Sequence, residues 1–243
     1  NGSIQNLLEL ARVPFTGSDM KASAVAMDKA TSKRIFESAK IITPKWKVYS
    51  FDSNTIDDSI LKEVKKYFKF PIIVKPNDGG STIGLTKVTK PQELRAALEL
   101  SLKESNVVLV EDFIKGRELT VPVLDGLALP VIEIIPKSGL YDYEAKYTKG
   151  KTEYIVPAKI PAKIAKAVQK VSVSVYEIIG AAGLARVDFM ITKSGKFYCL
   201  EINTLPGMTE LSLSPMAAKA LGISFDRLIE KMVESALKNF KSR

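Results

Sequence analysis

The stretch RVDFMITKSGKFYCLEINTLPGM, residues 186–208, decides the fold of this chain. Its two halves are rich in apolar and aromatic residues and flank a Ser-Gly pair at 194–195. Such a pair between two strand-like runs predicts a β-hairpin with a two-residue turn. In that register Asp188 lies directly opposite Glu201. Alternation along the strands puts both carboxylates on one face, which Cys199 shares by parity with Glu201.

Two carboxylates directly opposite each other repel, so we expect a cation between Asp188 and Glu201. Arg186 and Asn203 form the next pair on the same face in this register. Carboxylate and amide oxygens are hard ligands that suit Mg²⁺, which usually binds one or two carboxylates together with the phosphates of a nucleotide. The alternative is a solvated acidic face on which Arg186 is the ion-pair partner.

The composition narrows the class of protein. The chain has 243 residues, 46% hydrophobic and 26% charged, as is ordinary for one large or two modest globular domains. No apolar run approaches the roughly 18 residues of a membrane span. The single cysteine, Cys199, allows no internal disulfide, so we expect a cytoplasmic protein with no membrane partner. The absence of histidine excludes Ser-His-Asp and Cys-His catalysis and His-ligated zinc.

The formal net charge of the chain is +9. A basic surface can indicate nucleic-acid binding, a solvated lysine-rich face or a site for an anionic ligand such as ATP. The lysines are scattered along expected helices, as at residues 62, 65, 66 and 69, and the sequence contains no RNA-binding aromatic motif and no zinc finger. We therefore expect no nucleic-acid partner.

Helical and strand-like segments mix without strict alternation, which predicts an α+β fold. The expected helices cover residues 4–10, 19–39 with a break near Asp28, 56–67, 94–102, 161–179, 215–221 and 225–239. The expected strands cover residues 45–51, 71–75, 107–111, 118–123, 129–135 and the two arms of the hairpin. A domain boundary is expected near residues 112–114.

The segment PIIVKPNDGGSTIG, residues 71–84, contains candidate anion-binding groups. A strand ends near Lys75, and a glycine-rich loop with Ser81 follows. Glycines let the backbone bend so that N–H groups approach an anion. An ordinary turn is the alternative.

Two later segments add candidate ligand contacts. In VVLVEDFIKGRELT, residues 107–120, a chain reversal can offer backbone groups to an adenine edge, and Glu118 can hold ribose hydroxyls; a solvated turn is the alternative. The segment GLYDYEAKYTKG, residues 139–150, groups three tyrosines with Lys146. An aromatic loop of this kind is typical of a lid that excludes water, and a mobile surface loop is the alternative.

Taken in order, these segments resemble the ATP-grasp enzymes and, within them, the D-alanine–D-alanine ligases. The resemblance runs from Gly2 to about Lys238 and rests on FTGS (15–18), MDKATSK (27–33), the loop at 75–84, YDYEAKYTKG (141–150) and LEINTLPGMTELS (200–212). It implies an α+β, ATP-grasp fold whose two α+β subdomains, residues 19–113 and 114–243, grip ATP between them. Residues 1–18 would be the remnant of an N-terminal α/β domain.

The resemblance implies a role for each matching position. The residues expected to bind ATP are Lys29, Lys75, Glu111, Phe113, Ile114, Glu118 and Lys146. The residues expected to hold two Mg²⁺ ions, which Mn²⁺ can replace, are Asp188, Glu201 and Asn203. The residues expected to act in catalysis are Ser81, Tyr147, Arg186 and Gly207, of which the last two would stabilise an oxyanion. Ser212 and Leu213 would bind the carboxylate of the second D-alanine.

The implied reaction is the ATP-dependent ligation of two D-alanines through an acyl phosphate, for peptidoglycan precursor synthesis. The partners would be D-alanine and ATP, and a homodimer is compatible with the resemblance. One alternative is a D-alanine–D-lactate or D-serine ligase, although relatives that make the ester usually lack a tyrosine at the position of Tyr147. The other is a catalytically inert nucleotide- or nucleic-acid-binding fragment, because the family's N-terminal domain, with its glutamate and histidine, is not in these 243 residues.

Overall fold

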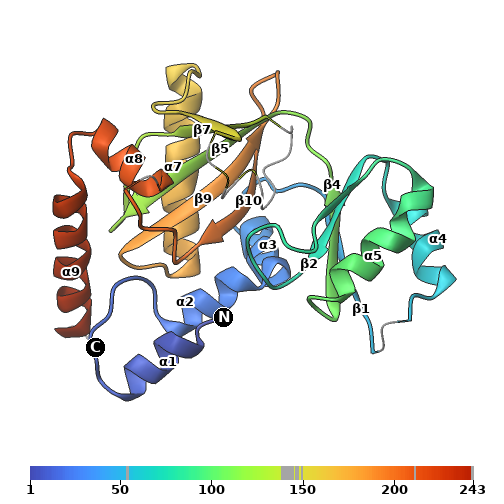
Figure 1. Ribbon diagram of the computed structural model, residues 1–243, viewed down its shortest axis with the longest axis horizontal. Coiled ribbons are helices and arrows are strands. Elements are labelled where there is room, and N and C mark those ends of the chain that lie inside the picture. The colour runs from blue at the N-terminus through green and yellow to red at the C-terminus, as the bar shows by residue number, and fades with distance from the viewer. Residues whose placement is uncertain (53–54, 138–144, 146–147, 149, 211, 242–243) are drawn as a thin grey trace.

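Two antiparallel β-sheets, each with its own helices and hydrophobic core, organise the chain (Figure 1). The computed structural model describes residues 1–52, 55–137, 145, 148, 150–210 and 212–241. The α+β class expected from the sequence is confirmed. In the described part of the chain, no helix is both long and apolar enough to cross a membrane.

The smaller sheet has four strands in the order β1-β4-β2-β3. Their bounds are β1 Trp46–Ser50, β4 Val107–Asp112, β2 Ile72–Pro76 and β3 Thr86–Val88. Helix α4 (Asp58–Tyr67) and helix α5 (Leu94–Leu102), which follows the 3₁₀ turn η1 (Pro91–Glu93), supply buried residues to one core with the sheet. Strand alternation points Ile72, Val74 and Val110 into this core, so Ile73, Lys75 and Glu111 face the other side.

The larger sheet has the strand order β10-β9-β5-β7-β8, with β6 paired to β5. Their bounds are β10 Phe197–Asn203, β9 Leu184–Ile191, β5 Arg117–Leu124, β7 Ile132–Pro136, β8 Thr152–Ile155 and β6 Leu127–Ala128. Helix α7 (Ala162–Ile179) packs on this sheet together with α2 (Met20–Met27) and α3 (Lys29–Ser38). The shared core includes Phe36, Val175 and Phe189.

Helices α8 (Leu213–Ala220) and α9 (Phe225–Lys241) lie beside the larger sheet at the left of Figure 1. They contribute Ala217 and Leu228 to a third buried cluster with β5, β7 and β9. Helix α1 (Ser3–Leu10) contacts α2.

The chain enters and leaves the smaller sheet at one place. The Asp112 N–H donates to the Lys45 carbonyl at 2.9 Å, and Trp46 pairs with Glu111. Residues 113–116 then lead from β4 into β5 of the larger sheet, close to the boundary expected at 112–114. The packing groups α2 and α3 with the larger sheet, and the division into residues 1–18, 19–113 and 114–243 stays a prediction.

The break expected near Asp28 is confirmed. Helix α2 ends at Met27 and α3 begins at Lys29. The Asp28 carboxylate accepts a hydrogen bond from the Thr31 N–H at 2.8 Å, which caps the first turn of α3. Hydrogen bonds also lower the pKa of Asp28, against the effect of its partial burial.

In the hairpin at 186–203 the expected residues pair with each other, but the turn is longer than expected and one strand contains a bulge. The turn has three residues rather than two: the Thr192 N–H donates to the Lys196 carbonyl, and Gly195 has a φ of 84°. A β-bulge between Cys199 and Glu201 then restores the expected register, so that Asp188 pairs with Glu201 and Arg186 with Asn203.

The bulge also corrects the position of Cys199. Parity placed Cys199 on the face of Glu201, but Cys199 pairs with Phe189 and lies fully buried in the core of the larger sheet. The prediction was wrong because one extra residue in the bulge, Leu200, shifts the alternation by one position.

Candidate active site

A cavity of about 400 Å³ lies between the two sheets. Its walls come from the inner face of the smaller sheet, the glycine-rich loop, the connection 113–116 and strands β5, β7, β9 and β10. The sequence-predicted site residues that line it are Lys29, Lys75, Ser81, Glu111, Phe113, Ile114, Glu118, Arg186, Asp188 and Glu201. Segments far apart in the sequence therefore meet around one space.

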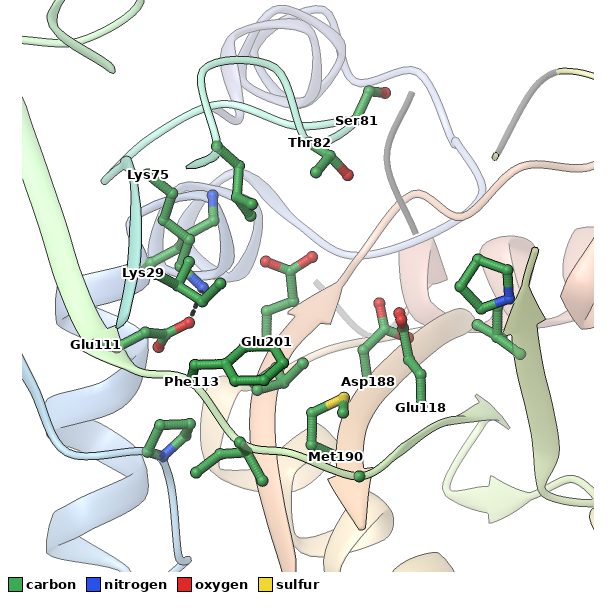
Figure 2. Close-up of a pocket in the computed structure, with 18 of the residues that line it drawn as sticks. Lys29, Lys75, Ser81, Thr82, Glu111, Phe113, Glu118, Asp188, Met190 and Glu201 are labelled. Carbon is green, nitrogen blue, oxygen red and sulfur yellow. Dashed lines mark hydrogen bonds and ion pairs between the residues drawn. The ribbon is translucent and has the colours of Figure 1, made fainter. Parts of the chain in front are cut away.

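The carboxylates of Glu118, Asp188 and Glu201 point into this space from the larger sheet (Figure 2). Asp188 is buried, and its carboxylate accepts two hydrogen bonds from Arg186, each 2.9 Å long. The Thr120 hydroxyl donates to the same carboxylate at 2.5 Å. These donors hold the Asp188 side chain in one orientation, as ligand-orienting groups do in metal sites.

The donor set on this wall fits a magnesium ion. Asp188 and Glu201 are paired across β9 and β10, and both line the cavity. In the described part of the chain, no group of three or more His, Cys, Asp or Glu side chains forms a metal cage by itself. That is compatible with Mg²⁺, because this ion commonly takes one or two carboxylates and completes its shell with water and phosphate oxygens. Arg186 forms an ion pair with Asp188. The alternative interpretation of the sequence, a solvated acidic face with Arg186 as ion-pair partner, therefore named the right partner for this carboxylate.

The opposite wall is basic. The Lys75 ammonium lies 2.5 Å from the Glu111 carboxylate, and the Lys29 ammonium donates to the Gly79 carbonyl at 2.9 Å. Burial lowers the pKa of Lys29, whereas the charge of Glu201 across the cavity raises it. The cavity therefore places ammonium groups and carboxylates on facing walls, an arrangement that suits an anionic chain bridged by a cation.

Glu111 is the most strongly perturbed carboxyl group in this wall. Burial alone would raise its pKa, but the charges of Lys33 and Lys75 and their hydrogen bonds lower it to about 2. Lys33 lies 2.8 Å from the second oxygen of Glu111. Glu111 therefore stays ionised and is held between two ammonium groups.

The glycine-rich loop covers the cavity from above in Figure 2, where Ser81 and Thr82 are labelled. Ser81 and Thr82 have φ values of 55° and 66°, in the left-handed region that non-glycine residues rarely adopt. Gly84, at φ 72°, packs so closely that an added Cβ would lie 2.8 Å from the Pro76 ring. The bend of the loop over the space therefore depends on left-handed backbone at residues 81, 82 and 84.

The connection 113–116 forms the apolar floor. Phe113 and Ile114 line the cavity together with Met190 and Leu200, and the Lys87 ammonium lies 4.0 Å from the centre of the Phe113 ring. An apolar region beside backbone groups suits a planar heterocycle.

The remaining predicted residues lie elsewhere. Among the described residues, Asn203 is the last residue of β10, and Gly207, Ser212 and Leu213 follow the hairpin; all four lie beyond the cavity lining. The Asn203 amide oxygen accepts from the Leu205 N–H at 3.1 Å. The Ser212 hydroxyl accepts from the Thr209 N–H at 3.0 Å, and the Leu213 side chain is buried in the third cluster. Leu213 can therefore offer only its backbone. Lys146 and Tyr147 lie outside the described residues.

Two polar residues that support the site were not predicted from the sequence. Lys33 belongs to the MDKATSK motif without a predicted role, although its spacing of four from Lys29 places both on one helical face. Asn77 is buried and joins the end of β2 to α3: its side chain accepts from the Ala30 N–H at 2.8 Å and donates to Asp28 at 3.0 Å. No local pattern in the sequence indicates that contact.

Comparison with known proteins gives one consistent result. A family model described as D-ala D-ala ligase C-terminus matches residues 35–234. The D-alanine–D-alanine ligase of Syntrophotalea carbinolica is 48% identical over 239 residues, which cover 97% of this chain and 74% of the relative. The ligase of Aquifex aeolicus is 45% identical and covers 96% of this chain and 77% of the relative.

Solved structures agree. A D-alanine–D-alanine ligase from Bacillus anthracis complexed with ATP superimposes with a TM-score of 0.83 at 35% identity, over 99% of this chain and 76% of that one. The VanG D-Ala:D-Ser ligase from Enterococcus faecalis superimposes with a TM-score of 0.85 at 34% identity, over 97% of this chain and 68% of that one.

Proposed function

The chain belongs to the D-alanine–D-alanine ligase family and has the ATP-grasp fold, and from this premise we propose how its residues carry out the reaction. The reaction is the ATP-dependent joining of two D-alanines through an acyl phosphate, which supplies a peptidoglycan precursor. The family's substrates are D-alanine and ATP. Because ATP is a cytoplasmic metabolite, the proposed location is the cytoplasm. A homodimer remains a prediction, to be measured by light scattering.

One observation supports the proposal most strongly. The paired carboxylates Asp188 and Glu201 face the ammonium groups of Lys29 and Lys75 across a single cavity. Phosphoryl transfer needs little covalent help from the protein and depends on positioning and charge stabilisation. A triphosphate placed between these walls meets positive charge on one side and cation ligands on the other.

The cavity residues have separate proposed roles in binding the phosphates, the adenine, the ribose and the metal ion. Lys29 and Lys75 bind phosphate oxygens, and the N–H groups of the loop at 79–82 cover them. Phe113 and Ile114 receive the adenine, and Glu118 accepts hydrogen bonds from the ribose. Asp188 and Glu201, with Asn203 once its amide turns from Leu205, would hold Mg²⁺, which when bound neutralises charge on the transferred phosphoryl group.

The second half of the reaction joins an amine to the activated carboxyl group. Arg186 is oriented by its two hydrogen bonds to Asp188. We assign it, with the Gly207 N–H, to the oxygen that becomes negative as the amine attacks. Ser81 and Tyr147 are assigned to the first D-alanine, and Ser212 with the Leu213 backbone to the carboxylate of the second.

The identity of the second substrate is tested directly. The structural similarity to a D-Ala:D-Ser ligase makes D-serine the acceptor to compare with D-alanine, and D-lactate is the third. Phosphate release from Mg-ATP is measured for the protein at its natural length with each acceptor. D-alanine is expected to give the highest kcat/KM, and a higher value for either other acceptor would assign the protein to that specificity instead.

The proposed catalytic role of the acidic pair is tested by Glu201→Gln. Losing one carboxylate ligand is expected to lower kcat by on the order of 100-fold, because several kcal/mol of charge stabilisation is lost. Glu99→Gln makes the same chemical change on the exposed face of α5 and should leave the rate unchanged. A wild-type rate in Glu201→Gln would refute the assignment.

A further inference from the structure

Lys33 is a lysine with no exposure to solvent. It lies on α3, one turn after Lys29, and its ammonium group contacts the Thr43 hydroxyl at 2.6 Å and the Glu111 carboxylate at 2.8 Å. Lysine is almost never fully buried unless it is paired. Burial lowers the pKa of Lys33, and the charge of Glu111 opposes that effect. The side chain stands behind the cavity wall rather than in it.

The contacts of Glu111 are divided between two lysines. One carboxylate oxygen meets Lys33 at 2.8 Å and the other meets Lys75 at 2.5 Å. Of these three side chains, Lys75 and Glu111 line the cavity. The cluster has a net charge of +1, and without Lys33 the remaining pair would be neutral. Lys33 therefore decides whether this part of the wall presents positive charge to a ligand.

The ion pair also joins the two sheets. Helix α3 packs on α7 and β10 of the larger sheet, whereas Glu111 and Lys75 belong to the smaller sheet. Strands β2 and β4 pair Ile73 with Glu111, so Lys75 is two residues further along the same face. Fixing Glu111 from α3 consequently fixes the wall that carries Lys75.

We propose that Lys33 is a positioning residue for the nucleotide phosphates: by compensating the charge of Glu111 and orienting it, Lys33 leaves the positive charge of Lys75 available to the phosphate chain. The inference rests on the proposed function, because it requires ATP in the cavity. It assigns Lys33 no contact with the nucleotide. Its effect must therefore depend on Glu111 and on the phosphates of the ligand.

The test measures the affinities of Mg-ATP and of adenosine by calorimetry for the protein at its natural length. In Lys33→Met, Glu111 is left to neutralise Lys75, so ATP affinity is expected to fall about tenfold or more while adenosine affinity changes less than about twofold. When Lys33→Met is added to Glu111→Gln, no carboxylate is left to neutralise Lys75, so the second change is expected to alter ATP affinity by less than about threefold. Lys21→Met, on the exposed face of α2, is the matched control and should change neither affinity.

Each outcome decides the inference. Equal loss of ATP and adenosine affinity in Lys33→Met would show a merely structural role and overturn it, as would unchanged ATP affinity. If Lys33→Met does not fold, Glu111→Gln is compared with the double variant: a difference in ATP affinity of about threefold or more would overturn the dependence on Glu111, and a smaller difference supports it. If wild type binds no ATP, the proposed function fails and the inference fails with it; if wild type binds ATP normally, only the Lys33 assignment is at stake.

Discussion

Gly116 gives the sharpest stability prediction because its neighbour is backbone. A Cβ at Gly116 would lie 2.1 Å from the Ile191 carbonyl oxygen, whereas ordinary contacts of a Cβ fall between 3.4 and 4 Å. The two backbone segments would have to separate by about 1.3 Å. Ile191 is buried and paired on both sides, with Arg117 of β5 and Phe197 of β10, so it cannot move without disturbing the ladder.

We therefore expect Gly116→Ala to lower the free energy of unfolding by about 3 kcal/mol, the upper part of the range for overpacking a rigid site. The φ of Gly116 is not in the left-handed region, so the cost comes from the contact and not from the backbone conformation. Gly80→Ala is the matched control. Its φ is also not left-handed and its Cβ would meet no atom within 4 Å, so its stability should stay within about 1 kcal/mol of wild type.

The assay is urea unfolding followed in parallel by circular dichroism and by fluorescence of Trp46, the single tryptophan, which lies on β1 of the smaller sheet. A Gly116→Ala protein within about 0.5 kcal/mol of wild type would show that the connection 113–116 yields easily, and would refute the reasoning. Loss of ATP affinity in the same variant is expected as well, because Phe113 and Ile114 lie in the displaced segment.

Two further predictions concern buried groups. Lys33 and Lys75 lower the pKa of Glu111 from 4.5 to about 2, so its ionisation stabilises the folded state above pH 4.5, and this contribution of about 3 kcal/mol is lost as the pH falls towards 2. Urea unfolding between pH 6 and 2.5 should show this loss. If the free energy of unfolding of Glu111→Gln falls with pH as steeply as that of wild type, the prediction is contradicted. Burial also raises the pKa of the Cys199 thiol, so iodoacetamide should label Cys199 only in urea, and fast labelling of the folded protein would show that the core placement is wrong.

The sequence predicted much of the hairpin but by a route that was partly wrong. Strand alternation and a Ser-Gly turn were enough to pair Asp188 with Glu201. The actual turn is one residue longer, and the bulge at Leu200 compensates for it. A bulge has no signal in hydrophobic periodicity, which is why Cys199 was assigned to the wrong face.

The site was predictable where local chemistry is distinctive. Glycines beside hydroxyl residues after an apolar strand indicated a candidate anion-binding loop, and the resemblance assigned Lys75 to ATP. The structure places the loop and Lys75 in the cavity lining, and their role in binding ATP stays a prediction. The supporting contacts depended on long-range packing, as with Asn77, which reaches the start of α3 from the end of β2. Such contacts join residues about 50 positions apart and leave no pattern in either segment.

The neighbouring entry and exit of the smaller sheet, at Lys45 and Asp112, limit how the cavity can change its width. Strands β2 and β4 are hydrogen-bonded to each other, so Lys75 and Glu111 belong to one rigid sheet. Asp188 and Glu201 belong to the other sheet, on β9 and β10. A change in the width of the cavity would then be a rotation of one sheet relative to the other about the connections at Lys45 and Asp112. The pairing within each sheet fixes the spacing of Lys75 and Glu111 on one wall and of Asp188 and Glu201 on the other, so the distance across the cavity depends on how the two sheets are joined, and the Lys33–Glu111 contact is one of those joints.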